Sequence, residues 1–175
     1  ALVWFRDDLR IADNPALLAA VASGRPLALV YCLDEVSEGI RPLGSASKWW
    51  LHHSLAVLAK ALERHGHRLI LKRGPANGLV FELASELGAK AVYWNRRYGE
   101  GERAVDAALK ARFKEKGVAV ESFQANLLFE PWTVRTQSDQ PFRVFTPFWR
   151  ACLRGEPPRE PLPAPRSWPK PVKAG

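Results

Sequence analysis

The sequence lacks several features that would place a protein in a narrow class. It has no methionine and only two cysteines, Cys32 and Cys152, which lie far apart. Neither cysteine has a Cys or His at the spacing of a metal site. No apolar run approaches the roughly 20 residues that a membrane-spanning helix needs. We therefore expect no disulfide framework, no metal site and no membrane contact, and we expect a cytoplasmic protein.

Common catalytic and phosphate-binding motifs are also missing. The chain has no G-x-G-x-x-G, no G-x-x-x-x-G-K-[ST] and no G-x-S-x-G, which argues against an NAD site, a P-loop and an α/β-hydrolase nucleophile. His52 and His53 are adjacent in a predicted helix, so their side chains point about 100° apart and do not easily share a ligand. The sequence therefore predicts no catalytic residue in this chain.

The charge balance is basic but not concentrated in one dense patch. The net charge is +8, and residues 150–175 supply half of it, with six Lys or Arg against two Glu. A basic surface is compatible with nucleic acid, although no Lys/Arg cluster interleaved with aromatic residues stands out. The seven tryptophans could pack in a core or stack on a flat conjugated ligand, and composition does not separate these two uses.

What the sequence does contain is a regular alternation of helices and strands. Gly24, Gly66, Gly88 and Gly117 each separate a segment of helical periodicity from a short apolar strand. Asn14 and Pro15 provide a helix N-cap and first residue. The chain therefore predicts a five-stranded, doubly wound parallel sheet with helices on both faces, Rossmann-like in class. The expected helices are 14–23, 45–65, 76–87 and 102–116, and the expected strands are 1–5, 26–32, 68–72, 90–95 and 118–123.

Ligands in such sheets bind beyond the carboxyl ends of the strands. This rule points to three loops, which begin around residues 4–6, 32–34 and 95–98. An irregular stretch at 124–140 follows the last strand, and Thr146 and Pro147 are expected to cap and begin a short helix that ends near Leu153.

The end of the chain is rich in proline. Seven of the fifteen residues from 157 to 171 are proline, which favours an extended, semi-rigid linker. We expect one α/β domain over residues 1–155 and the start of an interdomain linker over 156–175. Because the chain begins directly on a strand without a methionine, we also expect it to be part of a longer protein.

Residues 4–17 read W-F-R-D-D-L-R-I-A-D-N-P-A-L. From physics alone, this string would be a salt-bridged loop that ends in an Asn cap. It also closely resembles the W-F-R-x-D-L-R-x-x-D-N-P-A-L signature of DNA photolyases and cryptochromes. Further similar segments follow in the right order, and the whole resembles the bacterial photolyase branch most. They are Y-C-L-D at 31–34, W-W-L-H-H-S-L at 49–55, Y-W-N-R-R-Y at 93–98 and V-F-T-P-F-W at 144–149.

The resemblance implies the amino-terminal domain of a two-domain, light-driven lyase that repairs cyclobutane pyrimidine dimers in DNA. In that family a second, helical domain holds FAD, and it lies outside this chain. The implied partners are that helical domain and damaged DNA, and the implied oligomeric state is a monomer. Two alternatives stay open: the same domain of a cryptochrome photoreceptor, or a stand-alone nucleotide-binding or interaction module.

The resemblance also implies an antenna chromophore, which absorbs light and passes excitation to FAD. Folate-binding relatives use an Asn-Glu pair that falls on Gly101 and Glu102, so only Glu102 matches. This favours 5,10-methenyltetrahydrofolate, with 8-hydroxy-5-deazaflavin or FMN as the alternative. Deazaflavin-binding relatives use the loop of Cys32, Leu33 and Asp34 and acidic residues that this chain replaces with Arg97 and Gly99. Further candidates for contact with the chromophore are Arg6, Lys48 and Tyr98.

Overall fold

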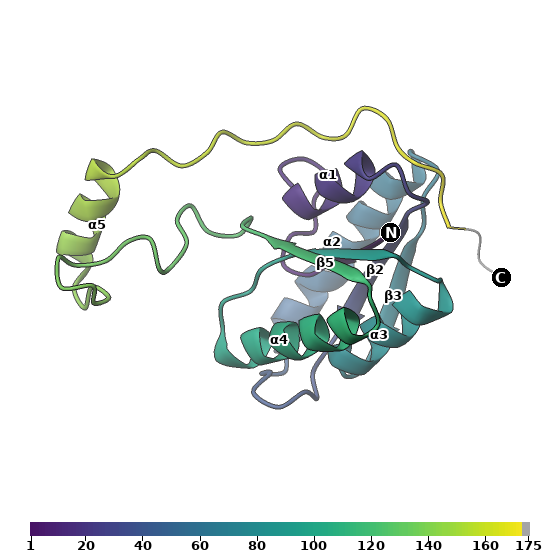
Figure 1. Cartoon of the computed structure of the whole chain (residues 1–175), viewed down its shortest axis with the longest axis horizontal. Coiled ribbons are helices and arrows are strands. Elements are labelled where there is room, and N and C mark those ends of the chain that lie inside the picture. The colour runs from purple at the N-terminus through teal and green to yellow at the C-terminus, as the bar shows by residue number, and fades with distance from the viewer. Residues whose placement is uncertain (173–175) are drawn as a thin grey trace. The chain divides into compact units, whose positions relative to one another are not determined.

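Strands and helices alternate strictly through the first 123 residues of the computed structural model, which describes residues 1–172. The predicted order of elements is confirmed (Figure 1). The elements are β1 (Leu2–Phe5), α1 (Pro15–Ala22), β2 (Ala28–Leu33), α2 (Ser45–Glu63), β3 (Leu69–Arg73), α3 (Ala76–Glu86), β4 (Ala91–Asn95), α4 (Glu100–Glu115) and β5 (Ala119–Phe123), followed by α5 (Phe145–Arg154).

The five strands form one parallel sheet in the order β3-β2-β1-β4-β5. The central strand β1 pairs with β2 on one side and with β4 on the other, with Leu2 opposite both Ala28 and Val92. The chain winds outward from β1 to β3, then crosses back to β4 and continues to β5. This reversal between β1 and β4 is the position where doubly wound sheets bind ligands.

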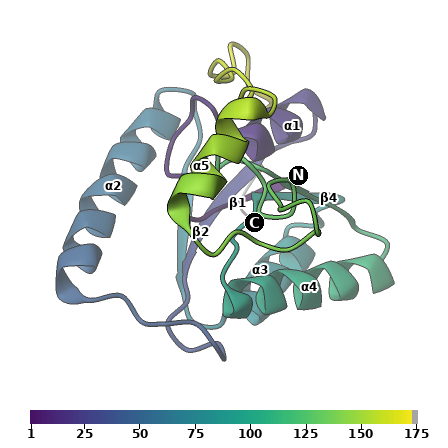
Figure 2. The same cartoon turned by 90° about the vertical axis from the view of Figure 1, so that its left-hand side faces the viewer.

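Helices cover both faces of the sheet, as predicted. Alternate strand residues point to opposite faces, so β1 contributes Phe5 to one core and Trp4 to the other. The Phe5 core includes Leu17 of α1 and Leu58 of α2. The Trp4 core contains α3 and α4 residues. Figure 2 shows α2 on one side of the strands and α3 and α4 on the other.

Two compact units make up the described chain: residues 1–126 together with 162–172, and residues 127–161. In the first unit, the proline-rich end runs back along the α/β fold. Leu27 donates its amide to the Lys170 carbonyl at 2.9 Å and accepts from Val172 at 3.1 Å. Trp168 stacks on His65, with ring centroids 4.6 Å apart. The predicted interdomain linker stays a prediction, but its later half is packed on the fold.

Helix α5 lies in the second unit and begins one residue before the predicted cap. Its N-cap is Val144, and no side chain caps it, so the prediction that Thr146 caps the helix is wrong. The first turn of a helix needs no intrahelical amide donor, and Pro147 is therefore accommodated inside that turn. Phe145 and Trp149 stack one turn apart with centroids separated by 6.3 Å. None of the helices in residues 1–172 is long and apolar enough to cross a membrane.

Candidate functional site

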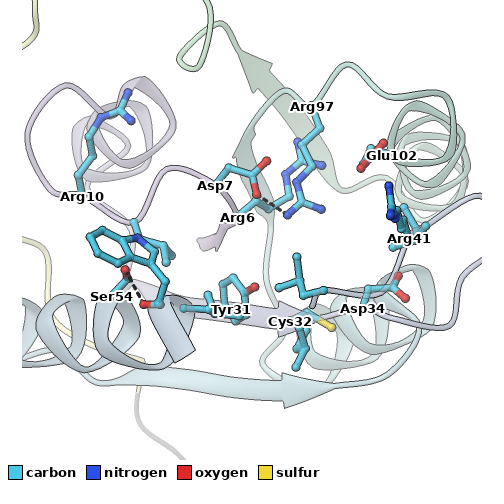
Figure 3. A pocket seen from close by; sticks show the side chains of 16 residues that line it. Arg6, Asp7, Arg10, Tyr31, Cys32, Asp34, Arg41, Ser54, Arg97 and Glu102 are labelled. Atoms are coloured by element: carbon cyan, nitrogen blue, oxygen red, sulfur yellow. Dashed lines mark hydrogen bonds and ion pairs between the residues drawn. The ribbon is translucent and has the colours of Figure 1, made fainter. Parts of the chain in front are cut away.

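A cavity of about 470 Å³ opens beyond the carboxyl ends of β1, β2 and β4. Its floor comes from residues that follow these strands, as the sequence predicts for this fold, including Arg6, Asp34 and Arg97. Helix α2 forms one wall with Trp50 and Leu51. Figure 3 shows labelled side chains around the cavity that come from the ends of the strands, from α2 and from the start of α4, while the Arg10 side chain points away.

The lining combines apolar surface with charge. Trp50 and Tyr31 offer aromatic surface, and five aliphatic side chains complete the apolar part: Leu9, Leu33, Ile40, Leu43 and Leu51. Four arginines and three acids supply the charge: Arg6, Arg10, Arg41 and Arg97 with Asp7, Asp34 and Glu102. A concave site of this volume with aromatic walls and a few charged groups is typical of small-molecule binding.

Arg6 belongs to a buried ion pair beneath the cavity. Its side chain is 2% exposed, and one terminal nitrogen lies 2.6 Å from Oδ1 of Asp106. The other terminal nitrogen donates to Asp106 Oδ2 at 3.1 Å and to the Asn95 carbonyl. Trp94 also donates its Nε1–H to Asp106 at 2.8 Å. The terminal nitrogens of Arg6 are thus committed to the fold.

Asp8, Asn14 and Asn95 form a second buried network that joins β1, α1 and β4. Asn14 caps α1 by accepting from the Leu17 amide at 3.0 Å, as predicted. Its amide nitrogen donates to Asp8 Oδ2 at 3.0 Å, and Asn95 donates to Asn14 Oδ1 at 2.8 Å. All three side chains are buried. The charged string at residues 4–17 therefore builds the floor of the cavity.

Arg97 and Asp7 form the ion pair at the centre of the cavity (Figure 3), with an N–O distance of 2.7 Å. Burial acts to lower the pKa of Arg97, but the Asp7 carboxylate, together with Tyr31 and Glu102, outweighs it and the net pKa is raised. Burial also raises the pKa of the neighbouring Tyr31 phenol to about 12. At neutral pH the cavity therefore contains a permanent guanidinium and a neutral phenol.

Asp34 is a structural carboxylate at the cavity edge. Burial acts to raise its pKa, but hydrogen bonds from the Ser37 hydroxyl at 2.6 Å and the Ala76 amide at 2.9 Å, with further backbone donors, hold that pKa below its usual value. Because Ala76 is the first residue of α3, Asp34 ties the loop after β2 to the start of this helix.

Cys32 is a buried thiol that stays protonated. Burial, followed by the nearby Asp34 charge, raises its pKa from 9.0 to about 11. Its contribution to stability is therefore complete below about pH 9 and is lost as the pH rises through about 11. The thiolate is the reactive form of cysteine. Cys32 lines the cavity as an unreactive group at neutral pH.

In a Cys152→Ser chain, Cys32 is the remaining cysteine. We expect iodoacetamide to alkylate it at pH 8 at least ~100-fold more slowly than a free thiol. The reason is that its raised pKa makes the thiolate fraction of Cys32 about 100-fold smaller than that of a free thiol. Mass spectrometry of timed samples measures the rate. The same chain in denaturing urea serves as the control and should react at the ordinary rate. Fast reaction of the folded chain would contradict the burial of this thiol.

Glu102 lies in the first turn of α4 and also lines the cavity. Its carboxylate folds back over Gly99, since a Cβ on Gly99 would lie 2.0 Å from Glu102 Oε2. A carboxylate here is stabilised by the helix dipole. Glu102 is thus placed both to support the start of α4 and to accept hydrogen bonds from a bound molecule.

Gly101 lies against the loop that follows β2. A Cβ at Gly101 would lie 2.4 Å from the carbonyl oxygen of Gly39, a distance that no side chain tolerates. Gly39 itself has a φ of +74°, which favours glycine. This close approach holds the loop, with Ile40 and Leu43, over the cavity. The absence of the expected Asn at position 101 therefore has a steric reason.

The structure brings together five of the predicted contact residues around the cavity: Glu102, Cys32, Leu33, Asp34 and Arg6. Gly101, Lys48 and Tyr98 are not among the lining residues. Lys48 instead pairs with Glu35 at 2.7 Å. In residues 1–172, no group of three or more His, Cys, Asp or Glu side chains is arranged to hold a metal ion.

Sequence reasoning missed the contribution of α2 and of the loop before it. Trp50 and Ser54 line the cavity from one face of α2, and Arg41 lies in the preceding loop. The exposed fraction of Trp50, 70%, is high for such a large apolar residue. The sequence signal for this wall was the pair of consecutive tryptophans, Trp49 and Trp50. Adjacent side chains on a helix point in different directions, so both rings cannot pack into the same core, and at least one is available to line a cavity.

Comparison with known proteins gives a consistent result. The DNA photolyase family matches residues 1–166. The deoxyribodipyrimidine photo-lyase of Agrobacterium fabrum is 49% identical over 178 residues, 98% of this chain and 36% of that protein. Cryptochrome-1 of Arabidopsis thaliana is 40% identical over 154 residues, 87% of this chain and 22% of that protein.

The fold of the chain is also similar to that of a solved photolyase. A bacterial class III photolyase from Agrobacterium tumefaciens has a TM-score of 0.84 and 47% identity, over 98% of this chain and 36% of that chain. The chain thus spans about a third of the length of the photolyases that it matches.

Proposed function

The chain belongs to the DNA photolyase family, and we propose that it is the antenna domain of a longer, light-dependent enzyme. The cavity beyond β1, β2 and β4 is the proposed chromophore site. The observation that carries this proposal is the combination of an aromatic wall, guanidinium groups and the Glu102 carboxylate in a cavity of about 470 Å³. An extended conjugated molecule with polar ring edges suits such a lining.

We infer that the chromophore is 5,10-methenyltetrahydrofolate. Glu102 supports this choice because a carboxylate can accept two hydrogen bonds from the amino and N–H groups of a pterin ring. Trp50, which is 70% exposed, offers a surface on which a ring can stack. Arg41, which is exposed at the cavity edge, is suited to the carboxylates of a glutamyl tail, since a guanidinium pairs with a carboxylate through two parallel hydrogen bonds.

An 8-hydroxy-5-deazaflavin or FMN is the second candidate. The cavity lies at the switch point of the sheet, with Cys32, Leu33 and Asp34 at its edge, as that alternative also requires. Arg97 stands where deazaflavin-binding relatives would have an acid, and it favours folate for that reason. Both ligands make the chain a light-collecting domain, in which the bound chromophore absorbs light and passes excitation to a flavin.

The residues of this chain would bind and orient the chromophore and shield it from water. Because the photolyase and cryptochrome relatives are much longer, the remaining activity belongs to the whole protein. We propose that this protein holds FAD in a helical domain, binds damaged DNA and repairs pyrimidine dimers. The photo-lyase relative matches more of the chain at higher identity than Cryptochrome-1 does, which favours repair over photoreception.

Glu102→Ala is expected to weaken binding of 5,10-methenyltetrahydrofolate by about 10- to 100-fold, because hydrogen bonds to a charged group contribute roughly 1.5–3 kcal/mol. Titration of the purified chain, followed by the near-ultraviolet absorbance of the bound ligand, measures the affinity. Glu100→Ala is the matched control: Glu100 lies in the same turn and has the same charge, but it is exposed and does not line the cavity.

Both variants remove one carboxylate from the first turn of α4, so we expect similar stability losses of about 0.3–1 kcal/mol. A difference in ligand affinity between them would then report the contact with the chromophore. Equal affinity of the Glu102→Ala chain and the unaltered chain would refute the role of Glu102. Failure of the unaltered chain to bind folate, FMN or deazaflavin would refute the antenna function itself.

A further inference from the structure

Two charged residues of the string at 4–17, Arg10 and Asp13, bond to distant parts of the chain. The Arg10 guanidinium donates through Nε to the Asp13 carbonyl at 3.1 Å and through a terminal nitrogen to the Ala125 carbonyl at 3.0 Å. The Asp13 amide donates to the Leu162 carbonyl at 2.8 Å, and Asp13 Oδ1 accepts from the Leu162 amide at 3.1 Å. The loop that contains Arg10 and Asp13 thus holds two segments that are far apart in the sequence.

Ala125 and Leu162 lie at the two ends of residues 127–161. Residues 1–126 and 162–172 belong to one compact unit, so the chain leaves this unit just after Ala125 and returns to it at Leu162. Both ends are hydrogen-bonded to the loop of Arg10 and Asp13. Holding the two ends of a segment together requires contacts that offset its loss of chain entropy. The loop supplies such contacts at the base of residues 127–161.

The pairing of Asp13 with Leu162 depends on the backbone of both residues. Asp13 has a φ of +49°, in the left-handed region that few residues other than glycine adopt and that aspartate tolerates better than most. In this conformation its amide and its carboxylate both bond to Leu162. Leu162 has a proline on each side, and proline carries no amide hydrogen. Asp13 therefore binds the single backbone donor that residues 161–163 offer.

The same loop also forms part of the cavity. Asp7 and Leu9 come shortly before Arg10 and line the cavity, and Asp7 pairs with Arg97 at its centre. The Arg10 side chain points away from the cavity, toward its contacts with the chain (Figure 3). A ligand that contacts Asp7 or Leu9 therefore acts on the same short loop as the two ends of residues 127–161.

We propose that Arg10 and Asp13 form a clasp, which holds both ends of residues 127–161 and links their attachment to the occupancy of the cavity. A ligand that orders residues 7–13 favours the closed clasp. The closed clasp favours the ligand by the same factor, because the coupling between two sites is reciprocal. The link to the cavity rests on the proposed antenna function, whereas the clasp itself does not.

Amide hydrogen exchange of the isotope-labelled chain, followed by NMR, tests the clasp at the Leu162 N–H. Asp13→Gly removes the carboxylate but suits a positive φ, so it should speed exchange at Leu162 at least ~10-fold. Asp13→Asn keeps an acceptor oxygen and tolerates the left-handed conformation, so it should retain most of the protection. The Val172 amide, which bonds to the Leu27 carbonyl, should exchange at the same rate in all three chains.

Asp139→Gly is the matched control. Asp139 also has a positive φ, of +56°, and its carboxylate also lies 3.6 Å from an arginine, Arg135. Its backbone bonds to Thr136 and Arg135 and not to Leu162, so its replacement should leave exchange at Leu162 unchanged. Exchange at Leu162 that is equally slow in the Asp13→Gly chain and in the unaltered chain would overturn the clasp.

A bound chromophore tests the link to the cavity. Saturation with 5,10-methenyltetrahydrofolate, or with FMN if the folate does not bind, should slow exchange at Leu162 about 5-fold, and Asp13→Gly should weaken the same ligand by about that factor. A ligand that binds without slowing this exchange would overturn the link and leave the antenna function standing. If neither ligand nor deazaflavin binds, the antenna function and the link are both refuted, and exchange at Leu162 still decides the clasp.

Discussion

Replacing Asp106 with alanine is expected to lower the free energy of unfolding by about 3–5 kcal/mol, the largest stability effect of any single change considered for this chain. Asp106 is buried, pairs with Arg6 at 2.6 Å and accepts the Trp94 indole N–H at 2.8 Å. Its removal leaves a guanidinium without a counter-ion beneath the cavity. Removing one partner of a buried ion pair costs more than the pair contributes, because the other charge stays desolvated.

Urea denaturation followed by circular dichroism measures this loss. Glu115→Ala is the control on the same helix: Glu115 is an exposed carboxylate at the far end of α4, and its removal should change stability by less than about 0.5 kcal/mol. A loss below about 1 kcal/mol for Asp106→Ala would mean that Arg6 can reach water. The floor of the cavity would then be less rigid than the structure implies.

Gly101→Ala is expected to destabilise the chain by about 1–3 kcal/mol and to weaken chromophore binding as well. An exposed glycine in a helix usually gains roughly 0.5–1 kcal/mol when it becomes alanine. Here the sign reverses, because the new Cβ would lie 2.4 Å from the Gly39 carbonyl oxygen. The loop after β2 must then move, and it supplies Ile40, Arg41 and Leu43 to the cavity.

Gly44→Ala is the matched control in the same loop. Gly44 has a φ of −70°, and a Cβ there would meet nothing within 4 Å. Because Gly44 is the N-cap of α2, where alanine is less favourable than glycine, stability should fall by less than about 1 kcal/mol, and ligand affinity should stay within error of the unaltered chain. Thermal unfolding and ligand titration give the two measurements. If Gly101→Ala proves as stable as the unaltered chain and binds the same ligand equally well, the contact between Gly39 and Gly101 does not hold the loop in place.

Much of the fold was predictable because its determinants are local. Apolar runs of strand length, helical periodicity between them and glycine at helix ends predict the five strands and their order along the chain, and Asn14 with Pro15 predicts the start of α1. The cap and the first residue of α5 were each predicted two residues too late, because Thr146 and Pro147 fit a capping pattern that the first turn does not require.

The position of the cavity was also predictable, but its walls were only partly so. The rule for parallel sheets directs attention to the loops after β1, β2 and β4, where the cavity lies. That rule does not predict which helix lines the cavity above those loops. Trp50 of α2 and Arg41 of the preceding loop reach the cavity through the path of residues 34–44, which depends on the contact between Gly39 and Gly101.

The sequence alone determined the alternation of elements, the class of sheet and the family, because each depends on short segments with their own spacing and chemistry. The tertiary structure decided the roles of the charged residues. The local sequence around Arg6 predicts a contact with a ligand. In the structure, however, its terminal nitrogens pair with Asp106, one hundred residues later in the chain. Partners that lie so far apart meet only when the sheet has assembled, and burial then determines whether each charge supports the fold or faces the cavity.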